Sequence, residues 1–252
     1  MNHVEPALLC RSLFLVLNLL IFPFLLPQKT GISISSTVMN FDYQGLRVNI
    51  LDTPGHQDFS EDTYRALAAA DNAIMLLDAA KGLEPQTRKL FEVCRMRQLP
   101  LFTFCNKMDR PAMSPYEIMD QIQEEFGLET YPILWPIGDG ERFKGVLDRT
   151  EDIVHLYQKP TTRGGKAEVI QVPLGDTEQL KKLIDDPELF GKLMEDAELL
   201  LELISPLDME RVLAGDQSPL FFGSAMYVTC VTGGMGYCYI VIFTFWIGGT
   251  IF

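Results

Sequence analysis

The stretch VNILDTPGH at residues 48–56 decides the fold class. Its first four residues form a mostly apolar run typical of a buried strand, and Asp52 follows directly. In nucleotide-binding α/β folds, an acid at the carboxyl end of such a strand is where a magnesium-linked carboxylate belongs. Gly55 would let its backbone N–H approach a terminal phosphate closely, and His56 would orient an attacking water. The alternative is an ordinary turn after a strand, with His56 incidental.

A second stretch, LFTFCNKMD at residues 101–109, has the same arrangement of an apolar strand followed by polar residues. The Asp109 carboxylate would accept two hydrogen bonds from the ring N–H and the exocyclic amine of guanine, a pair that adenine cannot supply. The Lys107 stem would cover the face of the base, while Asn106 would tie neighbouring loops together. The alternative is again a polar turn after a strand.

Periodicities between and around these stretches alternate in the manner of an α/β fold. Apolar runs predict strands over residues 46–51, 73–77, 101–105, 131–137 and 219–222. Helical patterns cover residues 59–70, 86–97 and 115–126, followed by β-rich text at 145–172 and acidic helical text at 176–204. The best signalled helix has Ser114 as N-cap, Pro115 next, Glu117 completing a capping box and Gly127 as its stop.

The two stretches, taken in order, resemble the guanine-nucleotide motifs of translational GTPases. DAAKG at residues 78–82 lies between them, and Gly223, Ser224 and Ala225 match the last motif. The text STVMNF at 36–41, FSEDTYRAL at 59–67 and YPILWPIGDGERFKGV at 131–146 is similar to the release factor 3 family. The resemblance implies an α/β, P-loop NTPase-like doubly wound sheet, the translation-factor G domain. It covers residues 31–226 and carries a small β-rich insertion at about residues 142–215.

The resemblance also implies the functional residues. Ile32 and Ser33 match the end of switch I, where Ile32 would shield the water near the catalytic His56. Magnesium would be held by Ser33 and, through water, by Asp52. The residues implied to bind GTP or GDP are Asp52, Thr53, Pro54, Gly55, His56, Asn106, Lys107, Asp109, Ser224 and Ala225.

The implied function is GTP hydrolysis in translation termination, with recycling of decoding release factors from the ribosome. The large ribosomal subunit is the implied partner, in the cytoplasm or in plastids or mitochondria. A formal net charge of −13 argues against nonspecific attraction to phosphate backbones, so any nucleic-acid partner would be bound through a local patch. Sequence-specific DNA is not among the expected partners. The five cysteines include no CxxC pair, which argues against a zinc site.

One departure from the family pattern is the phosphate-binding loop, since no G-x-x-x-x-G-K-[ST] occurs in the 252 residues. That loop supplies backbone donors, a lysine and a hydroxyl to the phosphates. We therefore expect an N-terminally truncated product whose nucleotide affinity is lower by roughly three or more orders of magnitude, with impaired hydrolysis. The alternative is a noncatalytic guanine-nucleotide-binding or interaction module tethered to a membrane by its N-terminus.

Both ends of the chain differ in composition from the stretch that carries the motifs. Residues 1–30 include the apolar run LFLVLNLLIFPFLL at 13–26, and residues 227–252 carry no charge. The first segment is interpreted as a substituted N-terminus, a signal anchor or targeting leader, or part of the core. The second is either translated non-coding sequence or a poor membrane segment, because its apolar run is far below the ~20 residues of a spanning helix. We expect neither to belong to the functional domain, and membrane association is not favoured.

Overall fold

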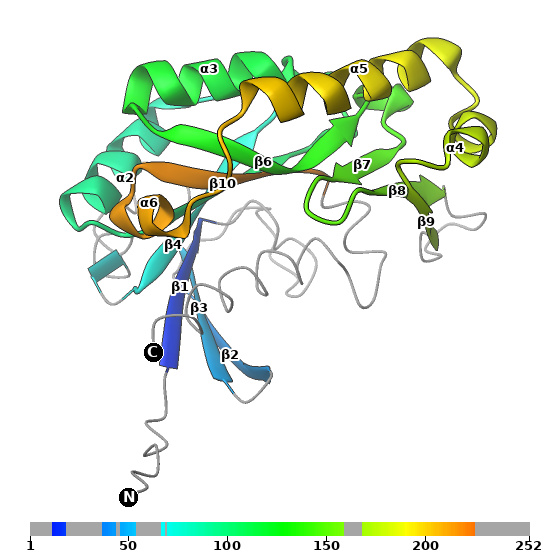
Figure 1. The fold of residues 1–252 in the computed structure, drawn as a ribbon. Coiled ribbons are helices and arrows are strands. Elements are labelled where there is room, and N and C mark those ends of the chain that lie inside the picture. Colours follow the sequence, from blue (N-terminus) through cyan, green and yellow to red (C-terminus); the bar gives the residue numbers. More distant parts are fainter. Residues whose placement is uncertain are drawn as a thin grey trace, which may run out of the picture. The chain divides into compact units, whose positions relative to one another are not determined.

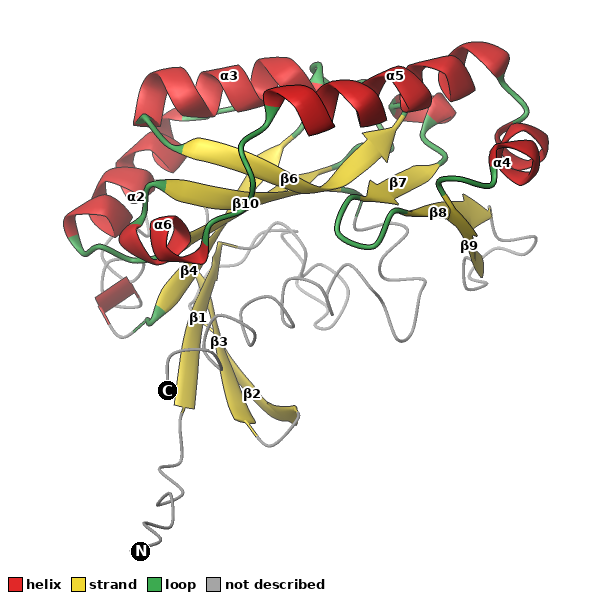
Figure 2. Cartoon of the chain, viewed as in Figure 1, coloured by secondary structure: helices red, strands yellow, loops and turns green. Residues whose placement is uncertain are grey.

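The structure is a computed structural model that describes residues 12–18, 37–43, 46–53, 67–68, 70–158 and 168–224 (Figure 1). The chain divides into two compact units, residues 1–73 and 74–252. The second unit contains both helices and strands, as Figure 2 shows by colour. The predicted α/β class is therefore confirmed.

The first unit contains three strands, β1 (Ser12–Asn18), β2 (Thr37–Tyr43) and β3 (Leu46–Thr53). β3 pairs on both sides, in parallel with β1 and in antiparallel with β2. The registers place Asp52 of β3 opposite Leu17 and Thr37. Part of the apolar run at residues 13–26 is thus a strand aligned with the one that carries Asp52. That this run lies outside the functional domain stays a prediction.

The sheet of the second unit has the strand order β4, β5, β10, β6, β7, β8, β9. Its first strands are β4 (Asn72–Asp78), β5 (Leu101–Asn106), β6 (Glu129–Ile137) and β10 (Gln217–Phe222). β10 runs parallel to both β5 and β6, although it comes last in the sequence. Every residue of β4, β5 and β10 is buried, which explains their continuous apolar runs. Helix α2 (Pro85–Met96) connects β4 to β5.

The far side of this sheet is antiparallel. β6 is followed by a short 3₁₀ helix (Gly140–Arg142) and by β7 (Gly145–Asp148), β8 (Ile153–Gln158) and β9 (Glu168–Pro173), each paired with its predecessor strand. The chain then forms α4 (Thr177–Ile184), α5 (Pro187–Leu203) and α6 (Met209–Ala214) before it returns as β10. An aspartate caps each of these helices by accepting a hydrogen bond from a backbone N–H of the first turn.

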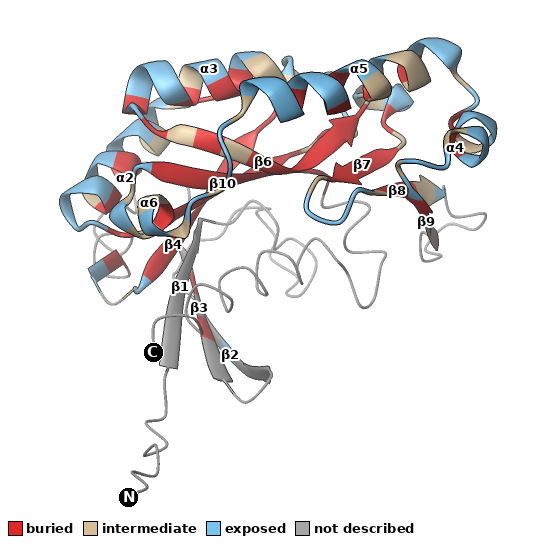
Figure 3. Cartoon of the chain, in the orientation of Figure 1, coloured by how far each residue is buried: buried red, intermediate tan, exposed pale blue. Residues whose placement is uncertain are grey.

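Helices α3 (Pro115–Phe126) and α5 lie over one face of the sheet (Figure 1). α3 begins where the local signals predict, with the Ser114 N–H donating to Glu117 Oε2 at 3.1 Å. It ends at Gly127, which has a positive φ of 63° and donates to the Gln123 carbonyl at 2.9 Å. The strands beneath these helices are buried, and the outer faces of the helices are exposed, as Figure 3 shows. The largest fully buried side chains include Trp135, Phe102, Phe221 and Phe222.

The predicted strands at 73–77, 101–105, 131–137 and 219–222 and the predicted helices at 86–97 and 115–126 correspond to described elements within a few residues. The predicted helix at 59–70 lies mostly outside the described residues, as does all of the segment 227–252. We predicted an insertion at about residues 142–215. The chain forms β7, β8, β9, α4, α5 and α6 between β6 and β10. The boundaries of the insertion stay a prediction. In the described part of the chain, no helix combines the length and the apolarity needed to cross a membrane.

Candidate functional site

Three loops meet at one edge of the second unit's sheet. They follow the neighbouring strands β4, β5 and β10 and comprise residues 78–82, 106–109 and 223–224. Backbone hydrogen bonds join them. The Ala79 N–H donates to the Asn106 carbonyl at 2.9 Å, and the Met108 N–H donates to the Gly223 carbonyl at 3.1 Å. The sequence motifs that come after these strands therefore form one contiguous surface.

Lys107 has an unusual backbone conformation at the centre of this surface. Its φ is +72°, in the left-handed region that non-glycine residues rarely adopt. Its N–H donates to Asn106 Oδ1 at 2.8 Å, and its carbonyl accepts from the Arg110 N–H at 3.0 Å. Its ammonium Nζ lies 2.6 Å from Asp78 Oδ2. Both ends of the lysine are thus held, which fixes the direction of the stem between them.

Asp78 is fixed by its own loop. Its Oδ1 accepts from the Ala80 N–H at 3.0 Å, and its carbonyl accepts from the Lys81 and Gly82 N–H groups at 2.9 Å each. Only 8% of its side chain is exposed, against 25% for Lys107. Burial alone would raise the pKa of Asp78, but the hydrogen bond from Lys107, the Ala80 N–H and the nearby lysine charges together lower this pKa below its ordinary value.

Asp109 lies half-buried beside the fully buried Ser224, whose hydroxyl donates to Asp109 Oδ1. The other carboxylate oxygen, Oδ2, accepts no hydrogen bond from the residues that the structure describes. Ser224 therefore orients a carboxylate that keeps acceptor capacity for a ligand. A base edge with two adjacent N–H donors, as in guanine, suits such an acceptor.

Four of the predicted nucleotide-binding residues, Asn106, Lys107, Asp109 and Ser224, are thus brought together. Asp52 and Thr53 are the last two residues of β3 in the first unit, and their side chains are not described. The remaining predicted residues, including both proposed switch residues, lie outside the described part of the chain: Ile32, Ser33, Pro54, Gly55, His56 and Ala225. The predicted magnesium ligands Ser33 and Asp52 are among those whose side chains the structure leaves undescribed.

Asp78 belongs to this surface although it was not among the predicted site residues. A local signal was present, because Asp78 is the last residue of a buried strand, and Asp52 likewise lies at the end of an apolar run. What the sequence did not show is that its carboxylate reaches Lys107, a residue of the next strand's loop. That contact depends on the pairing of β4 with β5.

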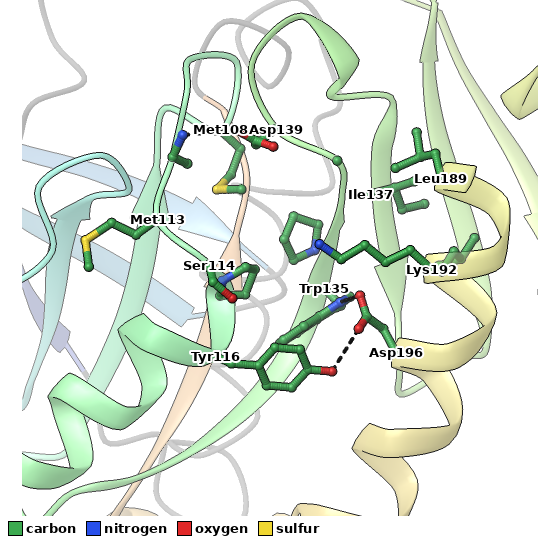
Figure 4. Close-up of a pocket in the computed structure, with 15 residues that line it drawn as sticks. Met108, Met113, Ser114, Tyr116, Trp135, Ile137, Asp139, Leu189, Lys192 and Asp196 are labelled. Carbon is green, nitrogen blue, oxygen red and sulfur yellow. Dashed lines mark hydrogen bonds between the residues drawn. The ribbon is translucent and has the colours of Figure 1, made fainter. Parts of the chain in front are cut away.

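A cavity of about 240 Å³ lies next to this surface and shares Met108 with it (Figure 4). Its walls come from the chain between β5 and α3, from the end of β6 and from α5. Within it, Tyr116 Oη and Trp135 Nε1 donate to the two carboxylate oxygens of Asp196, at 2.9 and 3.0 Å. This buried carboxylate therefore ties α3, β6 and α5 together.

The family model described as the Elongation factor Tu GTP binding domain matches residues 26–241. A solved structure from Thermus thermophilus has a similar fold, with a TM-score of 0.56 and 23% identity, covering 78% of this chain and 30% of that chain.

The similar curated proteins are peptide chain release factors 3. Those of Trichodesmium erythraeum and Acaryochloris marina are 61% and 59% identical over 200 and 201 residues. That of Microcystis aeruginosa is 56% identical over 210 residues. Each match covers 79% of this chain and 36% of the relative, so the chain spans little more than a third of these relatives' length. The chain belongs to the Elongation factor Tu GTP binding domain family of translational GTPases, and the curated proteins named above, to which it is similar, are peptide chain release factors 3.

Proposed function

We propose that the surface formed by residues 78–82, 106–109 and 223–224 recognises the guanine base of GTP and GDP. The observation that carries this proposal is the pairing of Ser224 with Asp109, which orients a half-buried carboxylate at the ends of parallel strands. Ligands of open α/β sheets bind at the carboxyl ends of the strands. The surface has the place and the acceptor that a guanine site requires.

Each residue has a separate part in this recognition. The two oxygens of Asp109 accept from the ring N–H and the exocyclic amine of guanine. The Lys107 stem covers one face of the base, and Asn106 holds the Lys107 backbone through its side-chain oxygen. The Ala225 N–H donates to the guanine carbonyl oxygen. A site that forms hydrogen bonds with the edge of its ligand can prefer the correct ligand over a similar one by as much as ~10⁴- to 10⁵-fold. The preference is large because the wrong base leaves buried polar groups of the site without partners.

The phosphate end of the nucleotide belongs, in this proposal, to residues of the first unit. Asp52 lies next to the end of a strand that is paired on both sides, which fixes the backbone from which it projects. Carboxylate and hydroxyl oxygens are ligands that suit Mg²⁺, so Asp52, through water, and Ser33 would hold this ion. Bound magnesium would neutralise charge on the phosphate oxygens. His56 would orient the attacking water, Ile32 would shield it, and Gly55 would donate to the terminal phosphate.

At the level of the whole protein, we propose a GTPase of translation termination that acts on the ribosome with decoding release factors. Support comes from relatives named peptide chain release factor 3 at 56–61% identity. The large ribosomal subunit would be the contact, in the cytoplasm or in an organelle. For the 252-residue chain we propose weak nucleotide binding and slow hydrolysis, since these residues contain no lysine-bearing phosphate loop.

The guanine assignment is tested by titrating the chain with labelled GDP and ADP, alongside Asp109→Asn. We expect GDP to bind more tightly than ADP, with most of this preference lost in Asp109→Asn, since an amide offers one acceptor where the carboxylate offers two. Asp139→Asn, an exposed aspartate on a neighbouring loop, serves as the matched control and should keep the preference. Equal affinity of the unmodified chain for both nucleotides would contradict the assignment.

A further inference from the structure

Among the described residues of the three loops, Asp78 and Lys107 form the one salt bridge in which both partners belong to these loops. The ammonium and carboxylate atoms lie 2.6 Å apart, and the carboxylate is almost fully buried. An exposed pair in the same region, Lys81 with Glu84 at 2.9 Å, has side chains that are 59% and 44% exposed. Exposed pairs contribute little, whereas removing one partner of a buried pair leaves an uncompensated charge.

The backbone of Lys107 is in the left-handed region, so contacts with neighbouring residues are needed to hold it there. Such conformations cost free energy and persist when the surroundings hold them. Asn106 and Arg110 hold the backbone, but they leave the long side chain free to rotate. A lysine side chain loses considerable rotamer entropy when it is ordered. The contact with Asp78 fixes the end of the stem before any ligand arrives.

Asp78 is suited to hold the Lys107 ammonium because its own loop fixes the orientation of its side chain. Its Oδ1 is held by the Ala80 N–H, and its carbonyl closes the turn through Lys81 and Gly82. The next residue, Ala79, donates to the Asn106 carbonyl and accepts from the Met113 N–H at 2.9 Å each. The loop that carries Asp78 is therefore joined by hydrogen bonds to both sides of the loop that carries Lys107.

We propose that Asp78 is a positioning residue of the guanine site: its carboxylate clamps the Lys107 ammonium and thereby holds the lysine stem in place against the base. The inference rests on the proposed guanine function and adds to it a residue that never touches the nucleotide. It acts by preorganisation, since a stem ordered in advance loses less entropy on binding.

The experiment measures the dissociation constant of guanosine diphosphate for the full chain and its variants by saturation-transfer NMR, which detects millimolar binding. Asp78→Asn keeps the shape of the side chain but removes the charge, and Lys107→Met keeps the stem but removes the ammonium. Glu84→Gln is the control, because it breaks the exposed ion pair in the same region. Urea unfolding of each variant measures stability separately.

We expect Asp78→Asn and Lys107→Met each to weaken binding about 10- to 100-fold, and Glu84→Gln to change it less than about twofold. Asp78→Asn in the Lys107→Met background should cause no further loss, since the clamped group is already gone. Additive losses, or reduced stability with unchanged affinity, would show a merely structural role and overturn the inference alone. If the unmodified chain bound guanosine and adenosine diphosphate equally, the guanine function would fail and the inference with it.

Discussion

At the residue scale, two carboxylates with different surroundings divide the work of the candidate site. Asp109 is half-buried and oriented by Ser224, so it keeps acceptor capacity for a base. Asp78 is buried, and both its oxygens are engaged by Lys107 and Ala80. The same residue type is thus proposed to bind the base in one loop and to position Lys107 in another, and the difference lies in the groups that contact each carboxylate.

The lowered pKa of Asp78 leads to a prediction about acid stability. The folded-state pKa lies below the ordinary value of 3.8, so the unfolded chain takes up the proton first as pH falls. The stabilisation is therefore fully present above pH 3.8 and is lost as pH falls through the folded-state pKa. We expect urea unfolding to show a constant stability difference between the unmodified chain and Asp78→Asn from pH 7 to about pH 5, which shrinks at lower pH. A difference that stays constant throughout the acid range would contradict the ion pair.

Some of the site residues could be predicted from the sequence, because their residue type and their position at the end of a strand indicated a ligand contact. Asn106, Lys107 and Asp109 follow an apolar run, and Ser224 follows another, so their common edge was predictable. The contact between Lys107 and Asp78 was not, because it depends on two loops separated by α2. No local pattern measures the distance between such loops.

At the element scale, Asp196 links two helices above the sheet to a strand of the sheet. It projects from α5 and accepts from Tyr116 of α3 and Trp135 of β6. The aromatic rings of the two donors also pack together, with their centroids 4.8 Å apart, and Trp135 meets Phe222 of β10 edge to face. Met108, which belongs to the loop at residues 106–109, lines the same cavity.

We therefore predict that Asp196→Ala lowers the free energy of unfolding by about 2 to 4 kcal/mol, because it leaves a buried indole N–H and a tyrosine hydroxyl without their acceptor. Glu198→Ala, an exposed position two residues along the same helix, should stay within about 0.5 kcal/mol of the unmodified chain. Urea unfolding followed by tryptophan fluorescence measures both. A loss at Asp196 no larger than that at Glu198 would show that the cluster does not stabilise the fold.

Elements with local signals were predictable, and elements defined by long-range pairing were less so. The bounds of α3 follow from Ser114, Pro115 and Gly127, because capping interactions involve only residues close together in the sequence. By contrast, the apolar text at 13–26 is compatible with a strand, a leader or a core segment. Its pairing with β3 over Ser12–Asn18 is a contact with a distant part of the chain.

At the scale of the whole molecule, base recognition and phosphate chemistry fall in different parts of the chain. The proposed base-reading residues with described side chains belong to the second unit, residues 74–252. The proposed phosphate and magnesium residues, from Ile32 to His56, belong to residues 1–73. The family model spans both parts, over residues 26–241. The two functions can therefore be tested separately.

We predict that the 252-residue chain hydrolyses GTP negligibly, because the water-positioning role proposed for His56 needs a phosphate held in place, and these residues contain no lysine-bearing phosphate loop. Phosphate release should rise when a family-type strand, P-loop and helix are joined ahead of Gly31, and His56→Ala should abolish this gain. Turnover by the unmodified chain that is as fast as in the extended chain, and that depends on His56, would contradict the prediction.

The central claim, that three strand ends form a guanine site, is tested most directly by an NMR titration of the isotope-labelled chain with guanosine diphosphate. We predict that the amide resonances of residues 78–82, 106–109 and 223–224 shift together as the nucleotide is added. Adenosine diphosphate at the same concentration should leave them in place. Resonances that stay unmoved at these three loops, or that shift only around the cavity at Tyr116 and Lys192, would contradict the account.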